Sequence, residues 1–326
     1  MDILVTNDKA LDWLLNTENP SLRYRVMTEL LDIPVINSEI VDLKNLIPNS
    51  PQVLQIFAKM HPDGYWLQQN ETTKRFVGDD VEYGSYATTH FCLSYLSELG
   101  LTKDNSLVAK AAERYLSLQK NDGDWFLHMS CLYGYNVRTF VRLGYRDDFR
   151  IQKAIDLMLQ TNRLDNGYLC DMHEKKTNKK KSCYRGTTKV LLAFSELPEY
   201  WNHPRCISLI DYFLDREGIF QRNDHSRYVN KDIFANSFPS GWYANLWEVL
   251  YSLSKMGYAK DVRLKRAWDL LDRNLDSDGR LKLDWTPTKC IWKIGKKEVT
   301  NEWLTFYILL AKKYREREKS NPDIKK

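Results

Sequence analysis

Apolar residues recur at helical spacing in two kinds of segment that alternate along the chain. In one kind they line a single face, as over 105–119, where Lys110 and Glu113 interrupt the apolar positions, and this pattern is typical of an amphipathic helix. In the other kind almost every face is apolar, as over 190–194 and 303–311, which predicts helices that are buried on all sides. The alternation predicts an outer ring of half-exposed helices around an inner ring of buried ones.

The buried segments end in a repeated stop signal, a leucine or methionine followed by glycine or proline. It occurs at Gly100, Gly144, Pro198 and Gly257, and these residue types commonly follow a helix end. Counting from these signals, we expect inner helices near 21–32, 84–99, 129–143, 184–196, 240–256 and 299–314. We expect outer helices near 8–16, 51–60, 105–119, 149–161, 204–216 and 260–274.

The helix pairs are variants of one repeat, and most copies end in an acidic turn with glycine, such as Asn121-Asp-Gly123. A repeat of this kind is one supersecondary unit that buries its apolar face against its neighbours. The copies follow one another without a linker, so we expect a single domain over 1–316 and a basic tail over 317–326. Six pairs predict an all-α fold, an α/α toroid of about six helical hairpins, with an open α-solenoid as the alternative.

The composition and charge of the chain limit the partners that we expect the protein to bind and the cellular compartment in which we expect it. No apolar run reaches about 18 residues, so no membrane span is expected. The first residues do not resemble a secretory signal, which favours a cytoplasmic location and reduced thiols for the six cysteines. The net charge of +5 comes largely from a lysine-rich segment, 175–181, and from the chain end. Such blocks are typical of solvated loops, so we expect no nucleic-acid partner.

A family resemblance follows from the motif Gln119-x-x-x-Gly123-x-Trp125, which resembles the glutamine–tryptophan repeat of squalene cyclases. The six predicted hairpins are similar to the toroid of terpenoid cyclases and protein prenyltransferase β-subunits. Segments that resemble bacterial and archaeal prenyltransferase/squalene-oxidase-repeat proteins are 20–26, 183–191 and 238–242. The resemblance implies an α/α toroid with an apolar or isoprenoid ligand in its central cavity. It also implies that an activity would be that of a transferase, lyase or isomerase.

In such a ring the inner helices all begin at one mouth, where their dipoles favour an anionic or electron-rich ligand. We expect the mouth to be lined by Tyr83, Tyr86, His90, His128, Cys131, Tyr135, Arg138, His173, Cys183, Tyr184, Arg185, Trp242 and Trp303. The candidate catalytic residues, which would position a substrate or transfer protons, are His90, His128, Tyr135 and Arg185. The alternative is that the aromatic residues simply fill the centre of the ring.

A candidate metal site combines thiols and an imidazole from adjacent repeats, namely Cys131, Cys170, His173 and Cys183. Such ligands select zinc over a hard cation. Four protein ligands make a closed structural site, whereas three leave a position for water or substrate. The alternative is that these are free, packed cysteines.

The positions of the acidic residues can be compared with the requirements of two further enzyme mechanisms. Class II terpene cyclases resemble one another in an Asp-x-Asp-Asp motif that protonates an alkene, and neither 78–82 nor 276–278 matches it. Acids on the rim loops could also supply the acid and base of a glycosidase, and the candidates are Asp79, Asp80, Asp171, Glu174 and Asp232.

Three functions therefore remain open from the sequence. The first is a squalene-cyclase/prenyltransferase-like enzyme that binds zinc and acts on an apolar or isoprenoid small molecule. The second is a non-catalytic toroid that binds a lipid or a peptide. The third is a carbohydrate-active (α/α)6 enzyme that uses rim carboxylates. The sequence does not fix the oligomeric state.

Overall fold

The computed structural model describes residues 8–69, 76–77, 87–171, 174–175, 181–241, 243–286, 290–292 and 294–317. The inner helices are α2 (Pro20–Arg25) continued by η1 (Val26–Leu30), α5 (Thr89–Glu98), α7 (Ser130–Arg142), α10 (Tyr184–Ser195), α12 (Leu246–Lys255) and α14 (Glu302–Arg317). The outer helices are α1 (Lys9–Leu15), α4 (Pro51–Phe57), α6 (Ser106–Leu116), α8 (Phe149–Gln160), α11 (Pro204–Leu214) and α13 (Lys265–Arg273). Short helices are η2 (Ile47–Asn49), η3 (Pro198–Tyr200), η4 (Lys231–Phe234) and η5 (Val262–Leu264).

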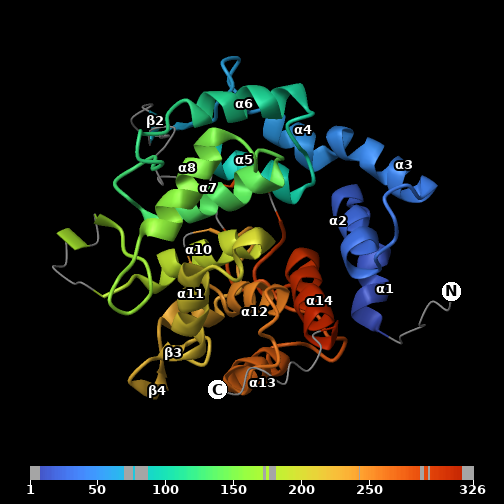
Figure 1. The fold of residues 1–326 in the computed structure, drawn as a ribbon. Helices are drawn as coiled ribbons and strands as arrows, with labels where there is room; N and C mark the ends of the chain where they lie inside the picture. The colour runs from blue at the N-terminus through green and yellow to red at the C-terminus, as the bar shows by residue number, and fades with distance from the viewer. Residues whose placement is uncertain are drawn as a thin grey trace.

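The predicted alternation of outer and inner helices is confirmed, and the helices form an α/α toroid (Figure 1). Within the inner ring, α7 packs between α5 and α10, and α12 packs between α10 and α14. Helix α14 then packs against η1. The last link joins the first and second hairpins, where Arg25 of α2 donates to Glu98 at the end of α5, with 2.9 Å between Nη1 and Oε2. An ion pair thus completes the ring.

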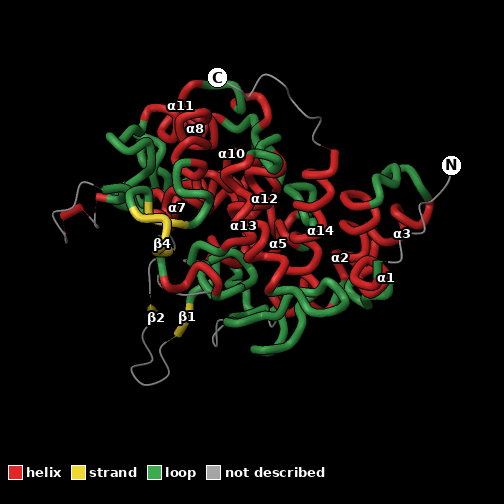
Figure 2. Tube along the Cα trace, turned by 90° about the horizontal axis from the view of Figure 1, so that it is seen from below, coloured by secondary structure: helices red, strands yellow, loops and turns green. Residues whose placement is uncertain are grey.

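One α-helix and two short pairs of strands were not expected from the sequence. Helix α3 (Ser38–Leu46) lies between the first inner helix and α4 and packs against α2. Its buried residues, Ile40 and Leu43, form a small second core with Met27. One strand pair is an antiparallel hairpin of β3 (Phe220–Gln221) and β4 (Asp224–Tyr228). It lies, like β1 (Gln68–Gln69) and β2 (Phe76–Val77), at the edge of the helical body (Figure 2).

The glutamine–tryptophan motif has a structural explanation. The side-chain amide of Gln119 donates to the carbonyl oxygens of Gly123 and of Arg150, at 3.0 and 2.7 Å. Gly123 has φ +90°, and a Cβ there would lie 2.5 Å from the backbone oxygen of Lys153. Trp125 stacks on Phe140 of α7 with parallel rings 6.4 Å apart. The motif therefore fastens this turn to the next outer helix, α8, and needs glycine for the close approach.

Aromatic side chains fill the centre of the ring. Phe238 stacks on Trp303 at 5.3 Å between ring centroids and meets Trp292 edge-on at 5.9 Å. Trp247 contacts Tyr307 at 4.9 Å. All five side chains are buried, so these aromatics belong to the core of the ring. No helix in the described part of the chain combines the length and the apolar character that a membrane crossing requires.

The inner helices end in charged side chains that meet near the ring axis, and we name this group the charged plug. It consists of Arg25, Glu98, Arg138, Arg142, Glu196 and Lys255. Glu98 accepts from Arg25, Arg138 and the Tyr307 hydroxyl. Glu196 accepts from Lys255 at 2.6 Å.

The placement of Arg138 corrects the prediction that it lines the mouth. It follows the first residue of α7 by about two helical turns, and its guanidinium therefore reaches the opposite end of the ring. There it pairs with Glu98 and donates to the Tyr307 hydroxyl at 2.9 Å.

Candidate functional site

The imidazole of His128 lies between two carboxylates at the end of the ring where the inner helices begin, and we name these three residues the rim cluster. Its Nδ1 lies 2.9 Å from Oδ2 of Asp171, and its Nε2 lies 2.9 Å from Oδ2 of Asp122. The backbone of His128 is left-handed, with φ +46°, and its N–H donates to Asp124 at 2.7 Å. A left-handed residue other than glycine costs free energy and is typical of functional sites. The strained turn aims the imidazole between the two acids.

The electrostatics of the rim cluster favour a charged imidazole. The hydrogen bond to Asp171 raises the pKa of His128, and the bond to Asp122 adds to this against partial burial. Burial acts to raise the pKa of Asp122, but hydrogen bonds from the Asp124 N–H and from His128 leave that pKa lowered. In the histidinium form both ring nitrogens donate, one to each carboxylate. The cluster can therefore hold a proton between two acids.

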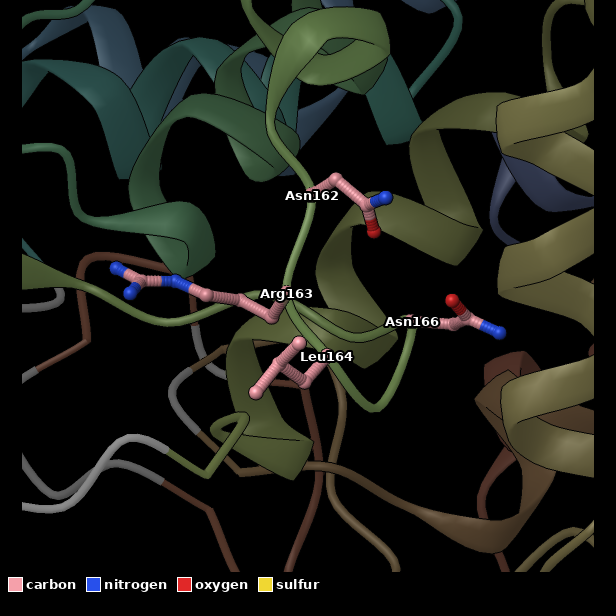
Figure 3. Close-up of a pocket in the computed structure, with 4 residues that line it drawn as sticks. All are labelled: Asn162, Arg163, Leu164 and Asn166. Atoms are coloured by element: carbon pink, nitrogen blue, oxygen red, sulfur yellow. The ribbon is translucent and has the colours of Figure 1, made fainter.

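A shallow pocket of about 460 Å³ lies beside the loop that follows α8 and is lined by Asn162, Arg163, Leu164 and Asn166. The side chains of Arg163 and Asn166 point to opposite sides of this loop (Figure 3). Arg163 pairs with Glu174 at 2.8 Å. Glu174, one of the predicted rim acids, therefore lies at the border of this polar pocket. It is close to Asp171 in the sequence.

A second polar group stands at the start of α10. Arg185 pairs with Asp232, at 2.6 Å between Nη2 and Oδ2. Its guanidinium lies 4.9 Å from the centre of the Tyr243 ring, and Tyr243 meets Trp285 edge-on at 5.2 Å. Both aromatic residues are only partly buried. The rim therefore offers flat aromatic surface beside charged groups.

These two groups stand on adjacent inner helices that approach closely. A Cβ on Gly186 would lie 2.1 Å from Oγ of Ser130 at the start of α7. A Cβ on Gly134 would lie 2.8 Å from the backbone of Lys189. The close packing of α7 and α10 places the turn that carries His128 next to the start of α10, which carries Arg185.

The three predicted thiol ligands lie at the same place. Burial raises the pKa of Cys131, and the neighbouring thiols Cys183 and Cys170 raise it further. The backbone N–H of Cys183 donates to Tyr168 at 2.7 Å, which ties the two loops together. His173 lies outside the described residues. Within those residues, no group of three or more His, Cys, Asp and Glu is placed to hold a metal ion, and the zinc site stays a prediction.

The other two predicted catalytic residues, His90 and Tyr135, lie in the core. Their rings meet edge-on at 6.0 Å, and both side chains are buried. Burial lowers the pKa of His90 to about 3, so the imidazole is neutral near neutral pH. The structure thus separates this pair from His128 and Arg185. Predicted residues outside the described part are Asp79, Asp80, Tyr83, Tyr86 and Trp242.

Sequence reasoning missed several polar residues of this region. Asp122 and Asp124 flank the motif glycine, and their place beside His128 depends on the turn. Lys189 lies four residues after Arg185 and therefore on the same helix face. It is buried, pairs with Glu248 at 2.5 Å and donates to Ser240 at 2.9 Å. A lysine directly before the apolar run 190–194 was the available signal, because a buried lysine needs a partner.

Similar folds occur among solved structures. A glycosyl hydrolase of family 88 from Bacteroides vulgatus has a TM-score of 0.52 at 12% identity, covering 96% of this chain and 92% of that one. A polysaccharide lyase has a TM-score of 0.47 at 13% identity, covering 83% and 86%. A type II terpene cyclase from Scytonema, in complex with merosterolic acid A, has a TM-score of 0.37 at 12% identity, covering 84% and 96%.

None of the protein-family models compared matches the chain, and no curated protein matches it in sequence. The similarity to the family 88 glycosyl hydrolase, at a TM-score of 0.52, supports the α/α-toroid fold.

Proposed function

We propose that this toroid is a carbohydrate-active enzyme whose site is the rim cluster with its neighbouring polar surface. The observation that carries the proposal is the placement of His128 between Asp122 and Asp171. Acid–base chemistry on a glycosidic bond needs a group that holds a proton and a carboxylate that is ionised. The rim cluster supplies both within one hydrogen-bonded unit, and this supports the proposal.

The proposed reaction is hydrolysis of a glycosidic bond. The rim cluster donates a proton to the leaving oxygen as the bond from the anomeric carbon to that oxygen breaks. A water molecule forms the new bond to the anomeric carbon, and a rim carboxylate accepts the proton of that water. The proton returns to the imidazole at the end of the cycle, so the cluster is regenerated.

The surroundings favour a saccharide over an apolar substrate. The rim presents Arg163, Glu174, Arg185 and Asp232 in ion pairs, and these groups can bind sugar hydroxyls. Tyr243 and the neighbouring Trp285 offer ring faces for the C–H side of a sugar. The isoprenoid hypothesis instead needs an apolar cavity in the ring centre, where the buried aromatics already pack against one another. The structural similarity to a glycosyl hydrolase is consistent with the proposal at the level of fold.

The test is release of reducing ends from a panel of oligosaccharides. We expect turnover of at least one, and a loss of about 100-fold or more in kcat/KM for Asp171→Asn and His128→Asn. The matched control is His61→Asn, because His61 is an exposed histidine beside an acid on the turn of the second hairpin.

Three outcomes would decide the matter. Saturable binding of an oligosaccharide without turnover would support a non-catalytic binding protein instead. Equal activity in the rim variants and the control would remove the rim cluster from the mechanism. Neither turnover nor binding across the panel would overturn the proposal.

A further inference from the structure

The turn before α7 differs from the other turns of the repeat at one position, the residue between the glycine and the apolar residue that follows it. This residue is Asp124, and its side chain is 1% exposed. The residues at the same position in other repeats are Tyr65, Tyr168, Ile219 and Arg280. A carboxylate is costly to bury without partners. An acid that replaces aromatic, apolar and basic residues at this position therefore calls for a specific role.

Asp124 closes a ring of three hydrogen bonds within the turn. The backbone N–H of His128 donates to Oδ2 of Asp124 at 2.7 Å, and the backbone N–H of Asp124 donates to Oδ1 of Asp122 at 3.0 Å. The other carboxylate oxygen of Asp122, Oδ2, lies 2.9 Å from Nε2 of the imidazole. The ring therefore fixes both the backbone and the side chain of His128, and it leaves Nδ1 facing Asp171 from the following turn.

The backbone of this turn is strained over two residues. Leu127 and His128 are both left-handed, with φ +48° and +46°. Residues other than glycine rarely adopt this conformation, because it brings Cβ close to a carbonyl oxygen. Such strain persists only where the surrounding contacts enforce it, and it is typical of functional sites. Because Asp124 accepts the N–H of the second strained residue, it is one of the contacts that enforce the turn.

Asp124 is itself held by Lys120, which lies between α6 and the turn. The backbone N–H of Lys120 donates to the Asp124 carbonyl oxygen at 2.8 Å, and its ammonium group lies 3.7 Å from Oδ2. The second carboxylate oxygen of Asp124, Oδ1, is buried and has no hydrogen-bond partner among the described residues. A buried carboxylate that served stability alone would be expected to use both oxygens. This arrangement instead serves the placement of His128.

We propose that Asp124 is a positioning residue, which holds the His128 imidazole between Asp122 and Asp171 so that the imidazole can deliver a proton to the substrate. The catalytic part of this inference rests on the proposed carbohydrate activity. Because its side chain is buried, Asp124 acts through the backbone of His128 and not on the substrate. Its charge acts in the same direction: the bond to Asp171 is the largest cause of the raised pKa of His128, and the charge of Asp124 adds to it.

The experiment is an NMR titration of His128 in the full chain, with its signals assigned by their loss in His128→Asn. We expect the wild-type pKa to lie above the ordinary value of about 6.5. Asp124→Asn removes the charge but keeps an oxygen that accepts the backbone N–H, and it should lower the pKa slightly. Asp124→Ala removes the acceptor as well, so the imidazole leaves its place beside Asp171 and the pKa should fall back to about 6.5.

The same variants test the catalytic consequence. Asp124→Ala should lower kcat/KM about tenfold or more through kcat, because the proton donor is misplaced while the binding surface is intact. Asp124→Asn should stay within about threefold of the wild type. The matched control is Asp278→Asn, since Asp278 lies on the equivalent turn of the last hairpin, and it should change neither the pKa of His128 nor the activity.

Asp124→Leu keeps the test decisive if Asp124→Ala does not fold, because leucine preserves the branched shape of the side chain without an acceptor. The positioning role is overturned if the pKa of His128 does not change in these variants. It is also overturned if they lower the pKa no further than Asp124→Asn does, since the lost charge would then explain the whole shift.

The NMR titration needs no substrate, so it separates this inference from the proposed function. If the pKa of His128 falls as expected but no oligosaccharide is turned over by the wild type, the proposed function fails and the role of Asp124 in placing the imidazole stands. If the wild type is active and the pKa of His128 in Asp124→Ala equals that of the wild type, the proposed function stands and the positioning role is wrong.

Discussion

Each end of the toroid carries a group of oppositely charged side chains. The group at one end is buried, and the group at the other end is exposed to water. In the charged plug the side chains of Arg25, Glu98 and Arg138 are 2%, 1% and 4% exposed. In the rim cluster those of His128, Asp122 and Asp171 are 42%, 47% and 38% exposed. Both groups are ion pairs at hydrogen-bond distance. The difference is that water screens the rim and leaves it accessible to a ligand, whereas Arg25, Glu98 and Arg138 at the centre of the plug are shielded from water.

Burial changes the consequence of removing one partner. A buried charge that loses its partner has no water to replace it, so the loss is large. An exposed pair gives up little when it is broken, because both charges are solvated again. The comparison therefore predicts that the plug governs stability and closure of the ring, while the rim cluster is free to carry function.

The largest effect is expected for Glu98→Leu. This change leaves the guanidinium groups of Arg25 and Arg138 buried without their shared carboxylate. We expect the free energy of unfolding to fall by about 3–5 kcal/mol, measured by urea denaturation. The control is Glu39→Leu, which breaks an exposed pair with Arg23 and should cost about 0–1 kcal/mol. Similar losses in both variants would contradict the distinction between buried and exposed pairs.

A second, smaller effect is expected at Lys189. Burial lowers the pKa of this lysine against the attraction of Glu248, and Lys189→Met would leave that carboxylate buried and unpaired. We expect a loss of about 3 kcal/mol in unfolding free energy.

The companion variant is Lys189→Met combined with Glu248→Gln. Glu248 also caps α12 by accepting from the Asn245 N–H at 3.0 Å, and glutamine can keep this bond. We expect the double variant to recover more than half of the loss in chemical denaturation. A double variant less stable than Lys189→Met alone would show that the pair is not the source of the effect.

The smallest effect is expected at the rim and depends on pH. The pKa of His128 is raised in the folded state, first by the bond to Asp171. Its stabilisation is therefore complete below the unfolded pKa of about 6.5 and is lost as pH rises through the higher folded value. We expect His128→Asn to lower the unfolding free energy by less than about 1 kcal/mol near pH 6, because the pair is exposed.

The same comparison at higher pH sharpens this prediction. The difference between wild type and His128→Asn should shrink by about pH 9. In an Asp171→Asn background the pH dependence should be weaker, since the main cause of the raised pKa is gone. If the difference in unfolding free energy between wild type and His128→Asn stayed constant with pH in both backgrounds, the prediction that the imidazole is charged would be wrong.

The sequence contained a signal for the charged plug that the pattern of apolar residues in the helices did not show. A charged residue directly precedes the repeated stop at the end of four inner helices, namely Glu98, Arg142, Glu196 and Lys255. Residues at the same place in successive repeats must meet if the chain closes into a ring. The prediction for Arg138 was wrong because closeness to a turn in sequence ignores the two helical turns that carry this side chain away from the mouth. Helix α3 was missed because its apolar residues cover only the small second core.

What the sequence determined by itself is the local and periodic part of the structure: which helices are buried, where they end and how many hairpins there are. This works because burial patterns and helix ends are properties of short segments. Only the tertiary structure decided which charges pair. Arg25 and Glu98 are 73 residues apart, and His128 and Asp171 are 43 residues apart. The pKa values of Arg25, Glu98 and His128 depend on their neighbours in space and on their exposure to water, and both are fixed only when the ring closes.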